Sequence, residues 1–140
     1  MPNFGTIEGR CQCGTVRYTV AAPAEEFYHC HCSICRRLHG ATFASYAGVA
    51  RGAFAIRQGA GNLLRFDSSP DCRRYRCVAC GCQLFFDDDR WPHLRFYAPG
   101  TADGHPGHPK RLEKHIFVAS KLPWYEIADD LPRFDGFPAD

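Results

Sequence analysis

The residues most capable of chemistry lie close together in Tyr28–Arg37. This stretch holds three cysteines and two histidines, followed at once by two arginines: Cys30, Cys32, Cys35, His29, His31, Arg36 and Arg37. Thiolates this close repel one another, so the cluster needs a metal ion or oxidation to neutralise it. Two further cysteine pairs, Cys11–Cys13 and Cys77–Cys80, lie on either side of it along the chain. The spacing predicts metal sites or a redox centre, and we favour metal.

Length and composition limit the kinds of protein this can be. A chain of 140 residues with 45% hydrophobic and 23% charged residues predicts one globular domain, residues 1–140. The formal net charge of +2 is too small to indicate a nucleic-acid partner. No apolar run is long enough to cross a bilayer, and the N-terminus lacks the features of a secretion signal. We therefore expect a cytoplasmic protein, in which nine cysteines indicate metal binding rather than disulfides.

The two flanking cysteine pairs together make one complete ligand set. Zinc held by four thiolates is closed and structural, and two cysteine pairs from distant parts of a chain supply such a set. Both pairs are followed by glycine, which suits a tight turn around a metal-bound sulfur. The alternative is that Cys11 and Cys13 are small buried apolar residues. We expect a structural zinc on Cys11, Cys13, Cys77 and Cys80.

The central trio, Cys30, Cys32 and Cys35, leaves a different kind of site. Three protein ligands leave one position on zinc open, and three thiolates give the centre one net negative charge. An external thiol would fit there, because the metal lowers its pKa and holds it as a nucleophile. The alternative is a closed, inert site completed by Cys72 or Cys82. His29 and His31 are further candidates for the fourth ligand, although on a strand they point away from the neighbouring cysteines.

Short alternating segments predict a mainly β fold of packed antiparallel sheets, with almost no helical periodicity. One short helix is expected from Ser33 to Leu38, ended by Gly40, with Ser33 as its N-cap and Cys35 in its first turn. The predicted strands are Thr6–Arg10, Thr15–Val20, Phe27–Cys30, Thr42–Val49, Phe54–Arg57, Leu63–Phe66, Cys72–Cys77, Gln83–Phe86, His93–Tyr97 and His115–Ala119.

Two other groups of polar residues have simpler interpretations. His105 and His108 lie in a loop rich in glycine and proline, and we expect both to be solvated, with metal binding as the alternative. Arg73, Arg74 and Arg76 are expected on the wet face of a strand, where they also offset the charge of zinc-bound thiolates. Contact with phosphate or with a substrate carboxylate is the alternative for these arginines.

The order of these motifs resembles the glutathione-dependent formaldehyde-activating enzyme (Gfa) family, which shares a domain with centromere protein V. The resemblance runs from about Gly9 to Pro132, and its motifs are G-x-C-x-C-G at 9–14, C-x-C-x2-C-R-x3-G at 30–40, C-x2-C-G at 77–81, H-I-F-V at 115–118 and P-W at 123–124. It implies an Mss4-like β-rich fold with zinc knuckles. It also implies two zinc ions per chain, a structural one on Cys11, Cys13, Cys77 and Cys80 and a catalytic one on Cys30, Cys32 and Cys35.

The family's activity, formally that of a carbon–sulfur lyase, joins glutathione and formaldehyde into S-hydroxymethylglutathione. Our leading hypothesis is a zinc-dependent enzyme that adds a small-molecule thiol, glutathione by resemblance, to a small electrophile such as formaldehyde, or releases it. The alternative is a non-catalytic zinc-stabilised module that binds protein or nucleic acid, which the low net charge disfavours. We also expect the second zinc to be lost more readily, leaving a disulfide among Cys30, Cys32 and Cys35.

Overall fold

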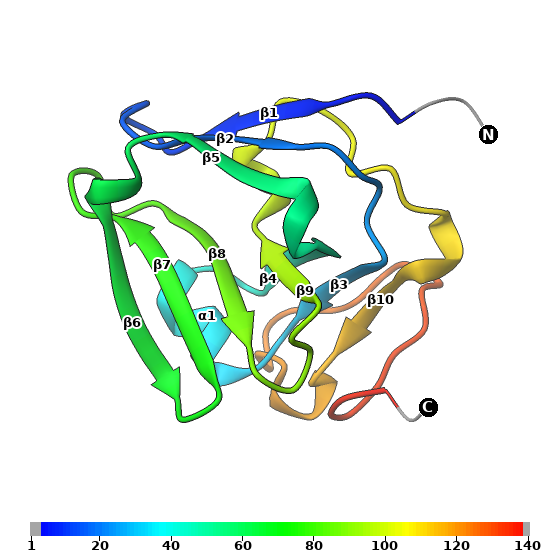
Figure 1. The fold of residues 1–140 in the computed structure, drawn as a ribbon. Coiled ribbons are helices and arrows are strands. Elements are labelled where there is room, and N and C mark those ends of the chain that lie inside the picture. Colours follow the sequence, from blue (N-terminus) through cyan, green and yellow to red (C-terminus); the bar gives the residue numbers. More distant parts are fainter. Residues whose placement is uncertain (1–3, 139–140) are drawn as a thin grey trace.

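The computed structural model describes residues 4–138, and in this part of the chain the backbone forms two β-sheets and one α-helix (Figure 1). The smaller sheet lies across the top of Figure 1 in the order β1-β2-β5. The larger sheet has the order β10-β3-β4-β9-β8-β7-β6. The strands are β1 (Ile7–Arg10), β2 (Arg17–Val20), β3 (Glu26–Cys30), β4 (Ala44–Ala50), β5 (Phe54–Gln58), β6 (Leu63–Ser69), β7 (Cys72–Cys77), β8 (Gln83–Asp88), β9 (Leu94–Tyr97) and β10 (Glu113–Ile116).

The predicted mainly β fold with antiparallel sheets is confirmed. Every neighbouring pair of strands is antiparallel except β10 and β3, which run parallel at one edge of the larger sheet. The last strand is shorter than the predicted His115–Ala119. It ends at Ile116 because Phe117 has a left-handed backbone, with φ of 55°, which takes the chain out of the extended conformation.

The larger sheet separates two hydrophobic cores, because successive side chains of a strand point to opposite faces. On β4, Ala47 and Val49 join one core while Ala44 and Tyr46 join the other. The first core also contains Cys11 and Cys77, and the second contains Cys30, Cys35 and Cys72. Each cysteine cluster is therefore attached to its own core.

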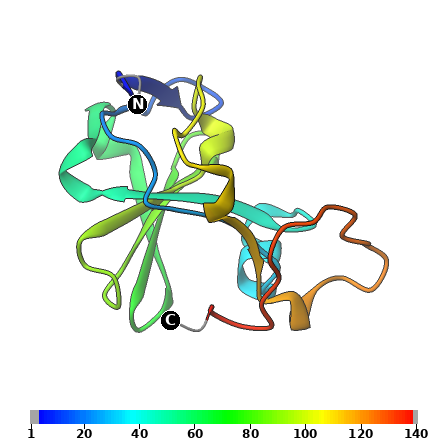
Figure 2. The ribbon, with the colours of Figure 1, turned by 90° about the vertical axis from the view of Figure 1, so that its right-hand side faces the viewer.

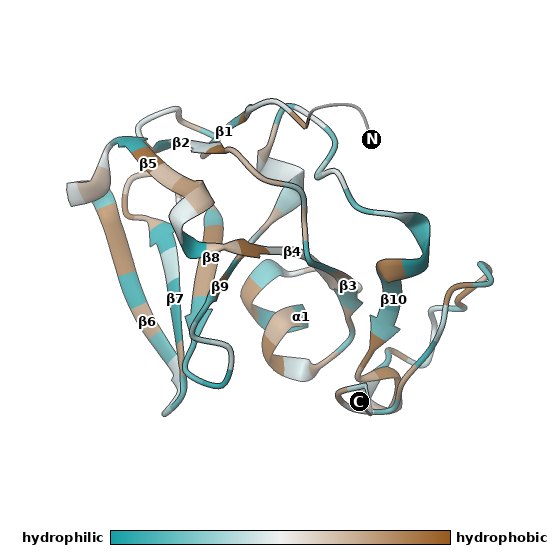
Figure 3. Cartoon of the chain, turned by 45° about the vertical axis from the view of Figure 1, so that its right-hand side comes forward, coloured by the Kyte–Doolittle hydropathy of each residue, from teal (hydrophilic) through white to brown (hydrophobic). Residues whose placement is uncertain are grey.

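Strand β7 contributes to both cores through its two faces. Cys72 packs in the second core and Arg74 is buried beside it, whereas Tyr75 and Cys77 pack in the first. The register between β7 and β8 shifts by one residue next to Tyr75. This irregularity lets Leu84, like its neighbour Phe85, pack in the first core. Because of its arginines, β7 is drawn mainly hydrophilic in Figure 3 although both of its ends are buried.

The helix α1 (Ser33–His39) lies against the larger sheet, begins directly after Cys32 and contains Cys35 (Figure 3). The predicted N-cap is wrong by one residue. Cys32 is the cap, because its backbone is extended and its Sγ accepts a hydrogen bond from the Cys35 amide at 3.3 Å. Gly40 ends the helix as predicted, in the left-handed conformation with φ of 57°.

The segment after β10, orange to red in Figure 2, extends beyond the sheets and then returns along β10. Its return is fixed by backbone hydrogen bonds on both sides of His115: the His115 amide donates to Pro132, and the Phe134 amide donates to His115. Across residues 4–138, every helix is too short or too polar to span a membrane.

Candidate metal centres and the adjoining cavity

Four of the predicted ligands form the first cluster, and the fold brings them together from two distant turns. The sulfurs of Cys11, Cys13, Cys77 and Cys80 all lie within 4.8 Å of one another. The first pair sits in the turn between β1 and β2, whereas Cys77 ends β7 and Cys80 lies in the turn that follows it. Cys13 Sγ is 3.6 Å from Cys11 Sγ and 3.8 Å from Cys77 Sγ. Four sulfurs at this spacing could hold a metal ion with no position left open.

The surroundings of this first cluster stabilise thiolate sulfur. The Val16 amide donates a hydrogen bond to Cys11 Sγ at 3.3 Å. Gly14, with φ of 79°, makes the tight turn that aims this backbone at the sulfur. Thr15 Oγ1 lies 3.1 Å from Cys13 Sγ, and its hydrogen bond lowers the pKa of Cys13 to about 6. Cys13 is therefore readily anionic, as a metal ligand must be.

The second cluster is formed by Cys30, Cys32 and Cys35, whose sulfurs also lie within 4.8 Å of one another. Cys30 ends β3, Cys32 caps α1, and Cys35 lies in the first turn of α1. Hydrogen bonds from Cys30 and Cys35 lower the pKa of Cys32. The hydrogen bond between Cys30 and Cys32 has the opposite effect on Cys30 and raises the pKa of that thiol. The three sulfurs thus differ in how readily they ionise, because neighbouring thiolates repel one another. A soft divalent cation would relieve this conflict, so the donor set fits zinc.

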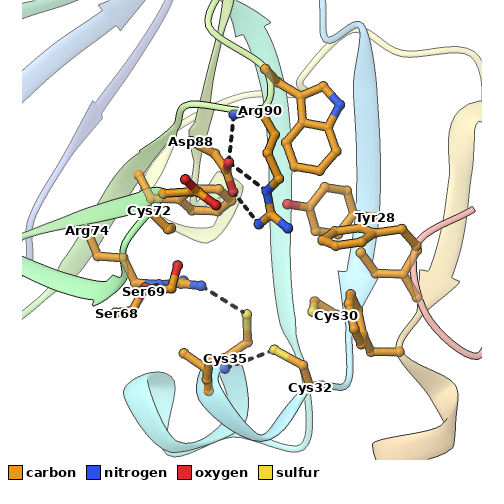
Figure 4. A pocket seen from close by; sticks show the side chains of 17 residues that line it. Tyr28, Cys30, Cys32, Cys35, Ser68, Ser69, Cys72, Arg74, Asp88 and Arg90 are labelled. Carbon is orange, nitrogen blue, oxygen red and sulfur yellow. Dashed lines mark hydrogen bonds and ion pairs between the residues drawn. The ribbon is translucent and has the colours of Figure 1, made fainter.

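The three sulfurs line a cavity of about 330 Å³ (Figure 4). Most of the other side chains that line it come from β3, β6, β7, β8 and the turn that follows β8, together with Ile116 and Phe117 at the end of β10 and Phe137 near the end of the described chain. The cluster of four sulfurs contributes no side chain to this cavity. Only the three-thiol cluster is therefore placed where a small molecule could reach it through this cavity.

Arg74 is the charged group of this cavity that lies against a thiol of the trio. Its Nη2 is 3.7 Å from Cys35 Sγ, while Nη1 donates to the Tyr46 hydroxyl at 3.0 Å and Nε to Ser68 Oγ at 2.9 Å. Its guanidinium also lies over the Phe86 ring, 4.8 Å from the ring centroid. Within residues 4–138, no carboxylate forms an ion pair with Arg74.

The expectation that Arg74 lies on a wet face is wrong, because only 8% of the residue is exposed. A buried cation with no carboxylate partner needs another anion nearby, and the thiol cluster supplies it. This position agrees with the other part of the same prediction, that arginines of β7 offset thiolate charge.

The two histidines on either side of Cys30 in the sequence point to other partners. His29 hydrogen-bonds to Ser45 at 2.7 Å through Nδ1 and to Glu113 at 2.8 Å through Nε2. His31 Nε2 is 2.9 Å from Nδ1 of His115, and burial lowers the pKa of His31 to about 4. Neither histidine belongs to the three-sulfur group. This matches the expectation that side chains on a strand alternate, so these two face away from the cysteines.

The two extra cysteines do not complete the trio. Cys72 lines the same cavity but lies outside the group whose sulfurs are all within 4.8 Å of one another. Cys82 packs against the first core, on the side of the four-thiol cluster.

The two loop histidines differ in exposure. His105 is exposed as expected, but the expectation is wrong for His108, whose side chain is 6% exposed. His108 is buried because it stacks on Phe27, with ring centroids 4.0 Å apart.

The fold and these sites together define a class of protein, a β-rich scaffold with two cysteine clusters that could each hold a metal ion. Residues 6–120 match the family model described as glutathione-dependent formaldehyde-activating enzyme, and the chain belongs to that family. A Halomonas elongata protein that bears the same description as a provisional name is 30% identical, over 94% of this chain and 88% of its own length. A crystal structure of a Rhodobacter sphaeroides protein shares the fold, with a TM-score of 0.60 and 22% identity over 75% of this chain and 94% of that one.

Proposed function

We propose that this protein is a zinc-dependent enzyme of the carbon–sulfur lyase type. It binds a thiol such as glutathione at the centre formed by Cys30, Cys32 and Cys35, and it joins that thiol to a small electrophile such as formaldehyde or releases it. The observation that carries the proposal is that the trio lines a cavity, whereas the four-sulfur cluster does not. The family's description and the name of the Halomonas elongata relative support glutathione and formaldehyde as the partners.

Zinc bound by the trio would lower the pKa of an incoming thiol and hold it as a thiolate at neutral pH. Arg74 places a fixed positive charge 3.7 Å from Cys35 Sγ, which favours an anionic sulfur in this cavity. Phe86 and Ile116 give the cavity apolar walls, which would reduce the number of water molecules around the reacting groups. The thiol releases its proton to solvent, the thiolate sulfur forms a bond to the carbonyl carbon, and the carbonyl π electrons pass to its oxygen. That oxygen takes up one proton from solvent, which balances the proton that the thiol released. The product is a hydroxymethyl thioether.

The four-thiol cluster has a different role in this proposal. A structural zinc on Cys11, Cys13, Cys77 and Cys80 would tie the turn between β1 and β2 to the turn between β7 and β8. Because the two pairs are far apart in the sequence, such a link removes much conformational entropy from the unfolded chain. Nine free thiols also suit a reducing compartment such as the cytoplasm.

The test is a native mass spectrum of the zinc-loaded protein with and without glutathione. We expect two zinc ions per chain and one glutathione adduct, and we expect Cys32→Ser to lose the adduct while Cys82→Ser keeps it. With isotopically labelled formaldehyde, NMR exchange spectroscopy should show faster formation of S-hydroxymethylglutathione with wild type than with Cys32→Ser. A fully zinc-loaded protein that neither binds glutathione nor accelerates this exchange would rule the proposal out.

The geometry gives less support to a nucleic-acid-binding module. Such a module would use the arginines of β7, but Arg74 faces the cavity and Arg73 forms an ion pair with Asp89 at 2.8 Å. The arginines of this strand therefore do not form a common surface that could follow a phosphate backbone.

A further inference from the structure

A second arginine, Arg90, lines the cavity from the turn that follows β8. Its Nε donates to Oδ1 of Asp88 at 2.9 Å and its Nη2 donates to Oδ2 of the same carboxylate at 2.7 Å. Asp88 is buried, with 3% of its side chain exposed, whereas 46% of the Arg90 side chain is exposed. Figure 4 shows the guanidinium directed into the cavity and held by the Asp88 carboxylate. One edge of Arg90 is thus fixed while the rest remains accessible.

Aromatic rings hold the same guanidinium. Its central carbon lies 5.0 Å from the centroid of the Trp91 ring and 4.9 Å from that of Phe137. A guanidinium has five N–H donors, and the contact with Asp88 uses Nε and Nη2. Within residues 4–138, no hydrogen bond joins Nη1 to a protein acceptor. Arg90 is therefore a rigid, oriented cation with donors left for a ligand.

The position of Arg90 relates it to the thiol centre. A second cavity of about 450 Å³ shares Tyr28, Arg90, Trp91, Ile116 and Phe137 with the first. The first cavity contains the three sulfurs, and the second contains the ion pair between Lys114 and Glu26, whose charged atoms are 2.7 Å apart. A molecule that places a thiol in the first cavity and charged groups in the second would pass Arg90.

We propose that Arg90 binds a carboxylate of the thiol co-substrate, so that the site selects thiols carrying a carboxylate, such as peptide thiols, over small neutral thiols. This inference rests on the proposed function. A guanidinium matches a planar carboxylate in shape and charge, and pre-orientation by Asp88 and the rings reduces the entropy lost on binding. The Lys114–Glu26 pair offers both signs of charge to the amino-acid end of such a molecule.

The test uses S-methylglutathione, which has the carboxylates of glutathione but no thiol to bind a metal. Isothermal titration calorimetry on the zinc-loaded protein should show binding to wild type, and Arg90→Gln should weaken it about 10- to 100-fold, the range for a lost charge-assisted hydrogen bond. The affinity for 2-mercaptoethanol, which has no carboxylate, should stay the same in both proteins.

Arg65→Gln is the matched control. Like Arg90, Arg65 donates through Nε and Nη2 to an aspartate two residues away, in this case Asp67. Arg65 lies outside both cavities. Its substitution should leave the binding of S-methylglutathione unchanged. Because Arg90→Gln leaves the buried Asp88 without its partner, the double variant Arg90→Gln/Asp88→Asn is measured as well. The double variant should fold and should show the same loss of affinity.

The outcomes separate this inference from the proposed function. If wild type does not bind S-methylglutathione, or if the double variant binds it as tightly as wild type, the role of Arg90 is wrong. Turnover of glutathione would in that case still support the proposed function. If binding depends on Arg90 but glutathione forms no adduct and no product, the carboxylate site stands and the proposed function fails.

Discussion

The two cysteine clusters use the same ligand atom at similar distances, yet they differ in what surrounds them. The four-thiol cluster joins two turns that are far apart in the sequence, and none of its sulfurs lines the cavity of the trio. The three-thiol cluster comes from one short stretch and faces that cavity, with the buried Arg74 beside it. Ligand number and access, rather than the chemistry of sulfur, therefore distinguish a site that holds the fold together from one suited to a reaction.

The larger sheet makes this difference possible by keeping the clusters apart. The four-thiol cluster is attached to the first core and the three-thiol cluster to the second, on opposite faces of that sheet. Each site can then have its own environment: a backbone amide and a threonine beside Cys11 and Cys13, and a guanidinium beside Cys35.

The largest expected effect comes from removing one ligand of each cluster in turn. Cys77→Ser should lower the midpoint of thermal unfolding by more than about 10 °C, because an open metal site no longer links the two turns. Cys32→Ser should lower it by less than about 3 °C, since the second metal does not bridge distant segments. Circular dichroism melts measure both. Equal losses in the two variants would remove the distinction between the clusters.

A smaller effect is expected in the kinetics of metal loss. With excess chelator, one zinc should leave at least about ten times faster than the other, because the trio exposes a coordination position that the four-thiol set does not. The absorbance of a zinc-binding dye follows the release. Cys32→Ser should lack the fast phase, and saturating glutathione should slow it in wild type. A single phase for both ions would contradict the picture of one open and one closed centre.

The next effect concerns the buried arginine beside the trio. Arg74→Gln should weaken the affinity of the three-thiol centre for zinc by about tenfold, the size of effect seen when a supporting residue around a metal is removed. Competition with a chelator of known affinity measures it. Arg73→Gln is the matched control, because Arg73 directly precedes Arg74 on β7, pairs with the exposed Asp89 and lines neither cavity. If both variants bind zinc equally well, Arg74 does not compensate thiolate charge.

The smallest effect is expected for the two remaining cysteines. Cys72→Ala and Cys82→Ala should each leave two zinc ions per chain, because neither sulfur joins a cluster. Each should cost no more than about 2 kcal/mol of stability, as for the loss of one small buried group. Native mass spectra and denaturant unfolding give the two readouts. Loss of one zinc from Cys72→Ala would mean that Cys72 closes the trio, which would remove the open position.

Much of this molecule could be predicted from local sequence. Alternating side chains predict the strands, and the cysteine spacing predicts both clusters, because ligands two or three residues apart must share a turn. The parallel pairing of β10 with β3 was not predicted, since it depends on a distant crossover. Nor does local sequence show that Arg74 faces the trio while Arg73 faces away, which depends on how β7 is seated in the sheet.

The walls of the cavity were missed for the same reason. Arg90 and Trp91 follow β8, Phe137 lies near the end of the described chain, and Tyr28 comes from β3. No spacing rule connects these residues, and single exposed aromatics or arginines carry no signal in sequence. Only the fold shows that they surround one charged group.

Strand β7 physically connects the two cysteine clusters, because it carries Cys77 of the four-thiol cluster and Arg74 beside the trio. It has six residues, and it ends at Cys77 after presenting Arg74 to the opposite face. A metal ion bound by the four-thiol cluster would therefore also help to set the distance between the Arg74 guanidinium and Cys35. A protein that cannot load the four-thiol centre, such as Cys77→Ser, should consequently bind thiols differently at the trio, even while Cys30, Cys32 and Cys35 still hold their metal.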